Sequence, residues 1–346
     1  MKEFILNQIG ALPDRLLNLA FLAERRHRNV TRQQYVAELD FYAQPQFREQ
    51  RQFLTLPESA PRFEKMTARN YHGGTETLYR YPSRYQPRNP AVAPRFFAHE
   101  QNRTGYLFHW QHPHPATKEP ERPLVLCVHG FRMGDPRRAK AMFKVRKLFE
   151  MGMDVALFIQ PHHWKRADGS IRQNFFNGED LPLTLENVGQ QIHDLHSCFL
   201  GLQNMGYQRI GLIGGSLGGL AVTLYATCTS APAFIFSVVP AIRIDGHLDP
   251  ARSRLPFKVD EEVRQKTFRA LDLIDPSFYR SKMALAHFGV VYHRGDRIND
   301  ARPTEKWIRD WQMKRVWSLA GGHWVVFDSK LRGQAWYGWL HEHGFC

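Results

Sequence analysis

The chain has 346 residues, of which 43% are hydrophobic and 23% are charged, the balance of an ordinary folded soluble protein. No apolar run in the sequence approaches the roughly 20 residues that a membrane-spanning helix requires, which excludes a helical integral membrane protein. Lysines and arginines number 47 against 33 aspartates and glutamates, and the resulting formal net charge of +14 favours anionic partners.

Three kinds of anionic partner fit this charge: nucleic acid, an acidic lipid surface, and a substrate that carries phosphate or carboxylate. No nucleic-acid-binding motif accompanies the basic residues, so we expect no specific nucleic-acid partner. The alternative is a solvated basic surface without a dedicated partner.

The N-terminus lacks the ordered parts of a signal peptide, because polar and charged residues interrupt its apolar segments. We therefore predict a cytoplasmic protein. The four cysteines are far apart in the sequence and include no C-x-x-C pair, which argues against a structural zinc site and a disulfide scaffold. We expect neither a metal nor a cofactor.

Residues 1–95 are predicted to form a helical N-terminal extension and a loop outside the main pattern. Apolar residues recur there at helical spacing in two stretches, first at Leu16, Leu19, Ala20 and Ala23, and then at Tyr35, Leu39 and Tyr42. Such an extension packs on the core or in a dimer contact, or it lies on a membrane surface as a basic amphipathic element. Peripheral membrane contact therefore stays open.

From about residue 97 the pattern becomes regular. Strands are predicted at 96–100, 105–111, 124–129, 154–159, 210–214, 233–239, 289–293 and 316–319. Helices are predicted at 136–151 and 183–205, from Leu217 onward, and at 304–312 and 324–341. Strands that alternate with helices imply an α/β fold, with a mainly parallel sheet that is covered by helices on both faces.

Residues 96–346 are thus predicted to form one α/β domain, in which the charged segment 245–276 is a candidate lid. Ligand chemistry in parallel sheets gathers at the carboxyl ends of the strands. Every candidate residue described below follows one of the predicted strands, so we expect these side chains to meet at one edge of the sheet.

The centre of the pattern is Gly214-Gly215-Ser216-Leu217-Gly218, a G-x-S-x-G motif between an apolar strand and a helix. This context predicts a sharp turn that holds Ser216 in a strained conformation over the sheet edge. A glycine-rich turn that only packs the helix on the strand is the structural alternative.

A serine hydroxyl needs a base to take its proton and an acid to orient that base. Downstream, one strand is followed by Asp296, and the next is followed by Gly321-Gly322-His323. The order Ser216, Asp296, His323 is the one expected for this architecture. Asp300 and Asp245 remain as alternative acids.

A tetrahedral intermediate also needs hydrogen-bond donors for its oxyanion. We predict the backbone N–H of Leu217, directly after the nucleophile, and the backbone N–H of Phe131, in the loop after strand 124–129. Gly130 permits the turn in that loop, and the side chain of His129 is interpreted as structural more than catalytic.

These residues resemble the α/β-hydrolase superfamily: H-G-F after the third core strand, G-G-S-L-G-G at the nucleophile, G-D-R-I after a late strand and G-G-H near the end. The resemblance covers about residues 100–345 and is nearest to a poorly characterised branch of α/β-hydrolase domain proteins, which share the P-H-H loop seen at Pro161–His163. It implies the fold and the triad but no substrate. One departure is that Asn299-Asp300 replace the usual proline after the acid.

Further residues are candidates for contact with substrate. His162 and His163 lie at the site's mouth or stabilise their own loop, and His129, Gly130 and Trp324 flank the predicted triad. A basic stretch from Arg132 to Lys147 faces the cleft, where it would bind an anionic head group, or lies on the outer side of a surface helix.

The sequence therefore predicts a serine hydrolase that cleaves a small-molecule carboxylic ester or thioester through an acyl-enzyme. The basic residues leave open that this substrate is anionic. An acyltransferase on the same fold is one alternative. The other is a non-catalytic scaffold whose basic face binds an anionic partner.

Overall fold

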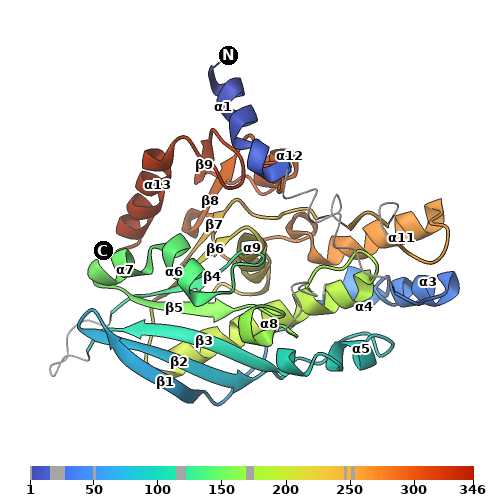
Figure 1. The fold of residues 1–346 in the computed structure, drawn as a ribbon, viewed down its shortest axis with the longest axis horizontal. Coiled ribbons are helices and arrows are strands. Elements are labelled where there is room, and N and C mark those ends of the chain that lie inside the picture. The colour runs from blue at the N-terminus through green and yellow to red at the C-terminus, as the bar shows by residue number, and fades with distance from the viewer. Residues whose placement is uncertain are drawn as a thin grey trace.

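The computed structural model describes residues 2–15, 28–49, 52–113, 122–168, 175–244, 248–250 and 254–346. Within these ranges nine strands form one sheet in the order β1-β2-β3-β5-β4-β6-β7-β8-β9 (Figure 1). The strands are β1 (Glu64–Tyr71), β2 (Gly74–Pro82), β3 (Thr104–Gln111), β4 (Leu124–Val128), β5 (Asp154–Ile159), β6 (Ile210–Gly215), β7 (Phe234–Val238), β8 (Phe288–His293) and β9 (Val316–Leu319).

Six neighbouring strands of the sheet run parallel, in the order β5-β4-β6-β7-β8-β9. The strands β1, β2 and β3 add an antiparallel edge next to β5. The central strands β4, β5 and β6 are buried along their whole length. A strand that is covered on both faces needs apolar side chains on both, which explains the nearly continuous apolar runs in these segments. The predicted α/β fold with a mainly parallel sheet is confirmed.

Helices cover both faces of this sheet. One face packs against α8 (Leu181–Asn204), α9 (Leu217–Cys228) and α12 (Ala301–Asp310). The other face packs against α6 (Pro136–Phe143), α7 (Val145–Glu150) and α13 (Ser329–Glu342). No helix within the described ranges is both long and apolar enough to cross a bilayer.

Several element boundaries differ from the sequence predictions. The stretch 96–100 is not a strand, because α5 (Ala93–Phe97) and a 3-10 turn (Glu100–Arg103) occupy it. The predicted helix 136–151 is divided at Lys144, whose φ of 50° is left-handed. The last helix begins at Ser329, where the Asp328 side chain accepts a hydrogen bond from the N–H of Leu331.

The sheet also begins earlier than expected, since β1 and β2 lie within residues 1–95, for which we predicted only helix and loop. Nearly all of β1 is exposed at the sheet edge, so its sequence carries no apolar alternation. His72 and Gly73 join the two strands with φ of 44° and 83°, as a two-residue type I′ hairpin requires. The Gly73-Gly74 pair was the feature of the sequence that could have predicted this hairpin.

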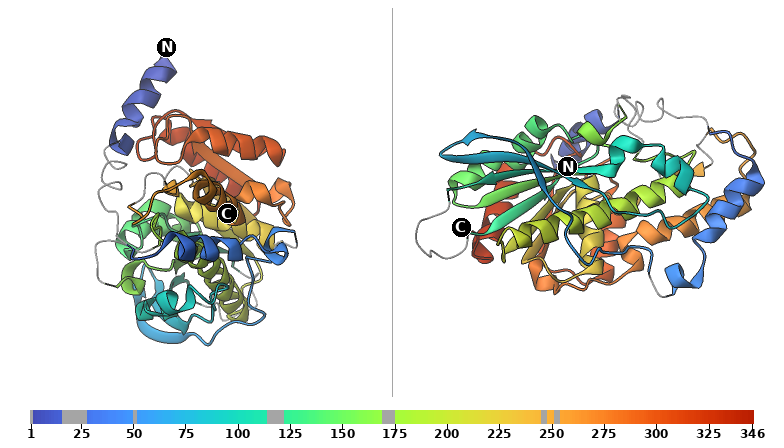
Figure 2. Two further views of the ribbon diagram at one scale, coloured as in Figure 1. Left: turned by 90° about the vertical axis from the view of Figure 1, so that its right-hand side faces the viewer. Right: turned by 90° about the horizontal axis from the view of Figure 1, so that it is seen from below.

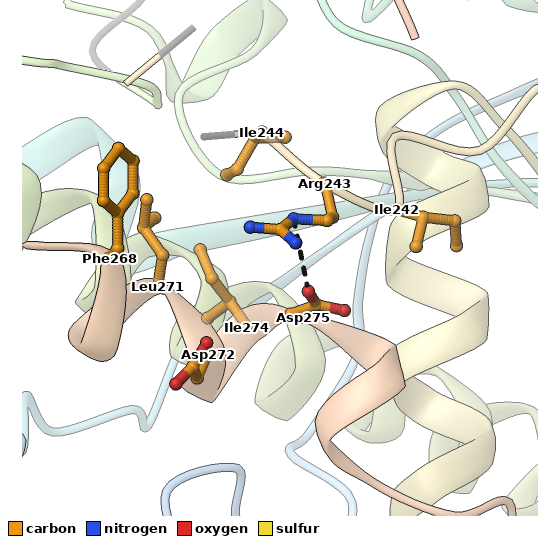
Figure 3. Close-up of a pocket in the computed structure, with 8 residues that line it drawn as sticks. All are labelled: Ile242, Arg243, Ile244, Phe268, Leu271, Asp272, Ile274 and Asp275. Atoms are coloured by element: carbon orange, nitrogen blue, oxygen red, sulfur yellow. Dashed lines mark ion pairs between the residues drawn. The ribbon is translucent and has the colours of Figure 1, made fainter. Parts of the chain in front are cut away.

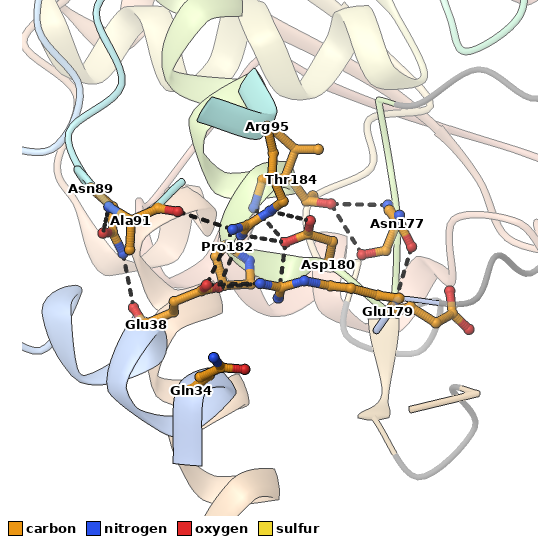
Figure 4. Close-up of polar contacts among 12 residues, drawn as sticks. Gln34, Glu38, Asn89, Ala91, Arg95, Asn177, Glu179, Asp180, Pro182 and Thr184 are labelled. Carbon is orange, nitrogen blue, oxygen red and sulfur yellow. Dashed lines mark hydrogen bonds and ion pairs between the residues drawn. The ribbon is translucent and has the colours of Figure 1, made fainter. Parts of the chain in front are cut away.

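The second helical stretch of the extension packs on the core. Tyr35 and Leu39 of α3 (Arg32–Phe41) are buried, and the hydroxyl of Tyr42 donates to Glu186 of α8 at 2.8 Å. Figure 4 shows Arg95 between two carboxylates, Glu38 of α3 and Asp180 at the start of α8, at 2.9 Å from each. These contacts support the core-packed alternative for residues 32–42. The first predicted stretch, at Leu16, Leu19, Ala20 and Ala23, lies outside the described residues.

The candidate lid contains α11 (Glu261–Leu271) and a 3-10 turn (Asp272–Ile274). Its last residue, Pro276, begins a second 3-10 turn (Pro276–Phe278). Two ion pairs join this segment to α3, from Lys266 of α11 to Asp40 and from Asp260, the N-cap of α11, to Arg32. Figure 2 shows the two helices side by side, at the end of the molecule farthest from α13. Residues 245–247 and 251–253 of the candidate lid lie outside the described residues.

Candidate active site

The G-x-S-x-G motif forms a sharp turn between β6 and α9. Ser216 has a φ of 55° and a ψ of −114°, a backbone conformation that a residue with a side chain rarely adopts. Two hydrogen bonds hold it there, from the N–H of Ser216 to the carbonyl of Val238 at 2.8 Å and from the N–H of Ala241 to the carbonyl of Ser216 at 3.3 Å. Ser216 is partly exposed and follows β6 at the carboxyl end of the parallel strands, where the sequence predicted it to lie.

The glycines of this turn allow its close packing. A Cβ on Gly218 would lie 1.9 Å from the carbonyl oxygen of Val128, and one on Gly214 would lie 2.1 Å from that of Gly218. A Cβ on Gly130 would lie 3.3 Å from the Cβ of Ser216, so the loop after β4 lies directly against Ser216. The sequence therefore needs glycine here for steric reasons as well as for the turn.

We expect Gly218→Ala to lower both thermal stability and activity, because backbone of β4 occupies the place of the added methyl group. The matched control is Gly338→Ala in α13, where nothing lies within 4 Å of the added atom. This control should leave activity unchanged and raise the unfolding free energy by up to about 1 kcal/mol, since alanine favours a helix. Thermal unfolding and ester turnover measure both effects, and an unaffected Gly218→Ala would contradict the packing argument.

His323 and Asp296 are brought together across two loops. Nδ1 of His323 lies 2.7 Å from Oδ2 of Asp296, and both side chains are buried. The second oxygen, Oδ1, accepts hydrogen bonds from the N–H groups of Ile298 and Asn299 at 2.9 and 2.8 Å. A carboxylate held in this way fixes the imidazole orientation and makes Nδ1 the protonated nitrogen.

The two alternative acids have different positions. Asp300 caps the N-terminus of α12, where it accepts from the N–H of Arg302 at 3.0 Å and forms an ion pair with the same arginine. Arg302 lowers the pKa of the Asp300 carboxyl. The structure thus places Asp296, and not Asp300, against His323. Asp245 lies outside the described residues.

Asn299 contacts both Ser216 and Asp296, which was not predicted from the sequence. Its side-chain amide donates to the carbonyl of Val239 at 2.7 Å and lies 3.4 Å from Oγ of Ser216. Its backbone N–H binds Asp296, so one residue contacts both Asp296 and Ser216. The available signal was the replacement of the usual proline by asparagine, which supplies the donors that proline lacks.

The loop after β4 is held by buried histidines. Nε2 of His163 accepts from the N–H of Arg132 at 3.1 Å, while its Nδ1 lies 2.7 Å from the carbonyl of Pro161. His129 binds the carbonyl of Gly130 through Nδ1 at 2.8 Å and the N–H of Gln160 through Nε2 at 3.2 Å. Burial lowers the pKa of His129 to about 4 and that of His163 well below the usual range, so both stay neutral.

His162 is also buried, and its Nε2 lies 3.1 Å from Nδ2 of Asn102 and 3.0 Å from Oδ1 of Asn187. Burial lowers its pKa to about 3. These contacts favour the structural interpretation of all three histidines over substrate contact. Trp324 differs, because 47% of it is exposed and its ring lies 5.4 Å from that of His323.

The basic stretch lies largely along α6 and α7. Several of its side chains have acidic partners, which are Asp135 for Arg137 and Glu150 for Arg146 on the surface, and the buried Glu76 for Lys140. The groove that these two helices line reaches Tyr71, at the amino end of the parallel strands and opposite to Ser216. This position supports a solvated surface for the part of the stretch from Lys140 to Lys147. Arg132 lies instead in the loop after β4, where its N–H binds His163.

A small pocket lies between the loop after β7 and the candidate lid. Figure 3 shows the aliphatic side chains of Ile242, Ile244, Leu271 and Ile274 around it, with Arg243 pointing to Asp275 at 3.7 Å. The same loop contacts the turn at Ser216 through the N–H of Ala241. The candidate lid therefore packs against the loop after β7 through apolar side chains. No group of three or more histidine, cysteine or acidic side chains in the described parts of the chain could hold a metal.

No protein-family model matches the chain. The uncharacterized protein Rv2627c of Mycobacterium tuberculosis is 27% identical over 344 aligned positions, which cover 92% of this chain and 78% of that protein. Acetyl xylan esterase 1 from a Thermoanaerobacterium species superposes with a TM-score of 0.59 at 13% identity, over 90% of this chain and 99% of the esterase. An acetyl xylan esterase from a Paenibacillus species has a TM-score of 0.55 at 12% identity, over 93% and 98% of the two chains. The chain has the α/β-hydrolase fold.

Proposed function

We propose that the protein is a serine hydrolase that cleaves carboxylic esters through an acyl-enzyme. The observation that carries this proposal is the 2.7 Å contact between His323 and Asp296, two side chains 27 residues apart, at the sheet edge that holds Ser216. A glycine-rich turn with only a packing role would need neither the strained serine nor the buried acid–base pair.

In the proposed first step, Oγ of Ser216 attacks the ester carbonyl carbon while Nε2 of His323 takes the hydroxyl proton. The C–O bond to the leaving alcohol then breaks, and His323 returns the proton to the alcohol oxygen. In the second step water attacks the acyl-enzyme with His323 again as base, which releases the acid and restores Ser216. The carboxylate of Asp296 stabilises the imidazolium in both steps.

The oxyanion of each tetrahedral intermediate needs two donors. We assign them to the N–H groups of Leu217, the first residue of α9, and of Phe131, next to Gly130. The close approach of Gly130 to Ser216 supports this assignment, as does the bond from Arg132 to His163 that fixes the same loop. Removing one donor of this kind typically costs about 10²–10³ in rate.

The neighbours named acetyl xylan esterases support oxygen esters and give a reason to begin a substrate series with acetyl esters. A thioester substrate uses the same steps, and acyl transfer differs only in that an alcohol or amine replaces water. Fold alone does not fix these choices. Dependence of the product on an added alcohol or amine distinguishes transfer from hydrolysis.

We expect a fluorophosphonate probe to label the natural protein at Ser216, because an activated serine attacks its phosphorus as it attacks an ester carbonyl. Peptide mass spectrometry locates the label, and turnover of p-nitrophenyl acetate measures the activity. Heat-denatured protein is the control for non-specific reaction. Folded protein without label or turnover would contradict the proposal, and an anionic partner that binds Ser216→Ala equally well and dissociates with salt would then favour the scaffold alternative.

A further inference from the structure

The N-terminal helix contacts both loops that hold the acid and the base. It comprises α1 (Lys2–Gly10) and continues through Arg15, since the N–H of Ala11 binds the carbonyl of Asn7 and that of Arg15 binds Ala11. Figure 1 and the left view of Figure 2 place α1 beside the C-terminal part of the sheet, near β9 and α12. The helix is therefore close in space to residues that follow it by 283 positions or more in the sequence.

The contacts recur on one helical face, at residues 3, 7, 10 and 14. Glu3 forms an ion pair with Arg294 at 2.5 Å, and the side chain of Asn7 accepts from the N–H of Gly321 at 2.9 Å. Gly10 packs closely on the loop that carries His323. An added Cβ at Gly10 would lie 2.3 Å from the backbone nitrogen of Gly322. Residues three and four apart share a helix face, so this spacing makes a continuous docking surface.

Asp14 completes this row and is the member nearest to the triad. Its Oδ2 accepts from the N–H of His323 at 2.7 Å and from the N–H of Arg297, directly after Asp296, at 3.1 Å. The side chain is fully buried, and Oδ1 has no hydrogen-bond partner among the described residues. Burial raises the pKa of the Asp14 carboxyl. Burying a polar group in this way is costly, which argues that the two bonds through Oδ2 matter.

We propose that Asp14 is a positioning residue, which sets the alignment of His323 with Asp296 by binding the backbone of both loops through one oxygen atom. This inference rests on the proposed function. The base follows Gly321-Gly322 and the acid follows Gly295, and glycines leave a backbone free to adopt many conformations. A fixed acceptor between the two loops removes that freedom. Misplacement of a catalytic group by about 1 Å can cost on the order of 10²-fold in rate.

The test compares Asp14→Ser with Asp14→Asn. Serine is too short to reach both N–H groups, whereas the amide oxygen of asparagine can accept from both as Oδ2 does. We expect Asp14→Ser to lower kcat for p-nitrophenyl acetate about 10–100-fold with little change in KM, and Asp14→Asn to stay within about threefold of the natural protein. Glu3→Gln, at the exposed end of the same face, is the matched control and should leave kcat unchanged, because an exposed ion pair contributes little.

A double-mutant cycle separates positioning from general structural support. If Asp14 acts through His323, Asp14→Ser should have no further effect on kcat in a His323→Ala background. Rates are divided by the folded fraction from thermal unfolding, so that a loss of stability is not counted as a loss of rate. An undiminished effect in that background, or kcat of Asp14→Ser within twofold of the natural value, would overturn this inference alone. No labelling or turnover by the natural protein would overturn the proposed function and this inference with it.

Discussion

Ser216→Ala is expected to lower kcat for p-nitrophenyl acetate by roughly 10⁴–10⁶-fold and to abolish fluorophosphonate labelling. The reason is that no acyl-enzyme can form without Oγ, and what remains is the contribution of binding and of the oxyanion donors. The fold should be unaffected or slightly more stable, because alanine removes only a partly exposed hydroxyl from the turn. Thermal unfolding beside the kinetic assay checks both statements.

Ser197→Ala is the matched control for this variant. Ser197 is buried in α8, and its hydroxyl donates to the carbonyl of His193 within the same helix at 3.1 Å. It should keep full labelling and turnover. Labelling that persists in Ser216→Ala would mean that the reactive nucleophile is another residue, and the assignment of Ser216 would be wrong.

Asp296→Asn is expected to lower kcat by about 10⁴-fold. The carboxylate accepts from Nδ1 of His323 at 2.7 Å, and an asparagine can present its amide N–H to that nitrogen instead. The imidazole would then carry its proton on Nε2, the nitrogen that has to take the proton of Ser216. The substitution keeps the volume of the side chain, so the loss arises from the wrong tautomer more than from a change in packing.

Asp300→Asn tests the alternative acid under the same conditions. Asp300 caps α12 and pairs with Arg302, so asparagine, also a good N-cap, should leave kcat within about twofold and change stability by less than about 1 kcal/mol. A greater loss of kcat in Asp300→Asn than in Asp296→Asn would reverse the assignment. Because Asp245 lies outside the described residues, an Asp245→Asn variant belongs in the same series.

The parts of this protein that the sequence determined are those that depend on near neighbours along the chain. Continuous apolar runs predicted the buried strands β4, β5 and β6, and alternation of strands with helices predicted the α/β fold. The turn at Ser216 could be predicted because glycines and a strand–helix junction specify its backbone locally. The edge strand β1 could not, since its exposed side chains carry no apolar pattern.

Only the tertiary structure decided which of the distant side chains meet. Asp296 and Asp300 are four residues apart and chemically equivalent, and the turn that ends at α12 directs one to His323 and the other to Arg302. The polar contact of Asn299 with Ser216 spans 83 residues, and the bond from His323 to Asp14 spans 309. Such pairs leave no periodicity in the sequence, because a hydrogen bond between loops depends on how the whole sheet and its helices pack and not on the spacing of residues along the chain.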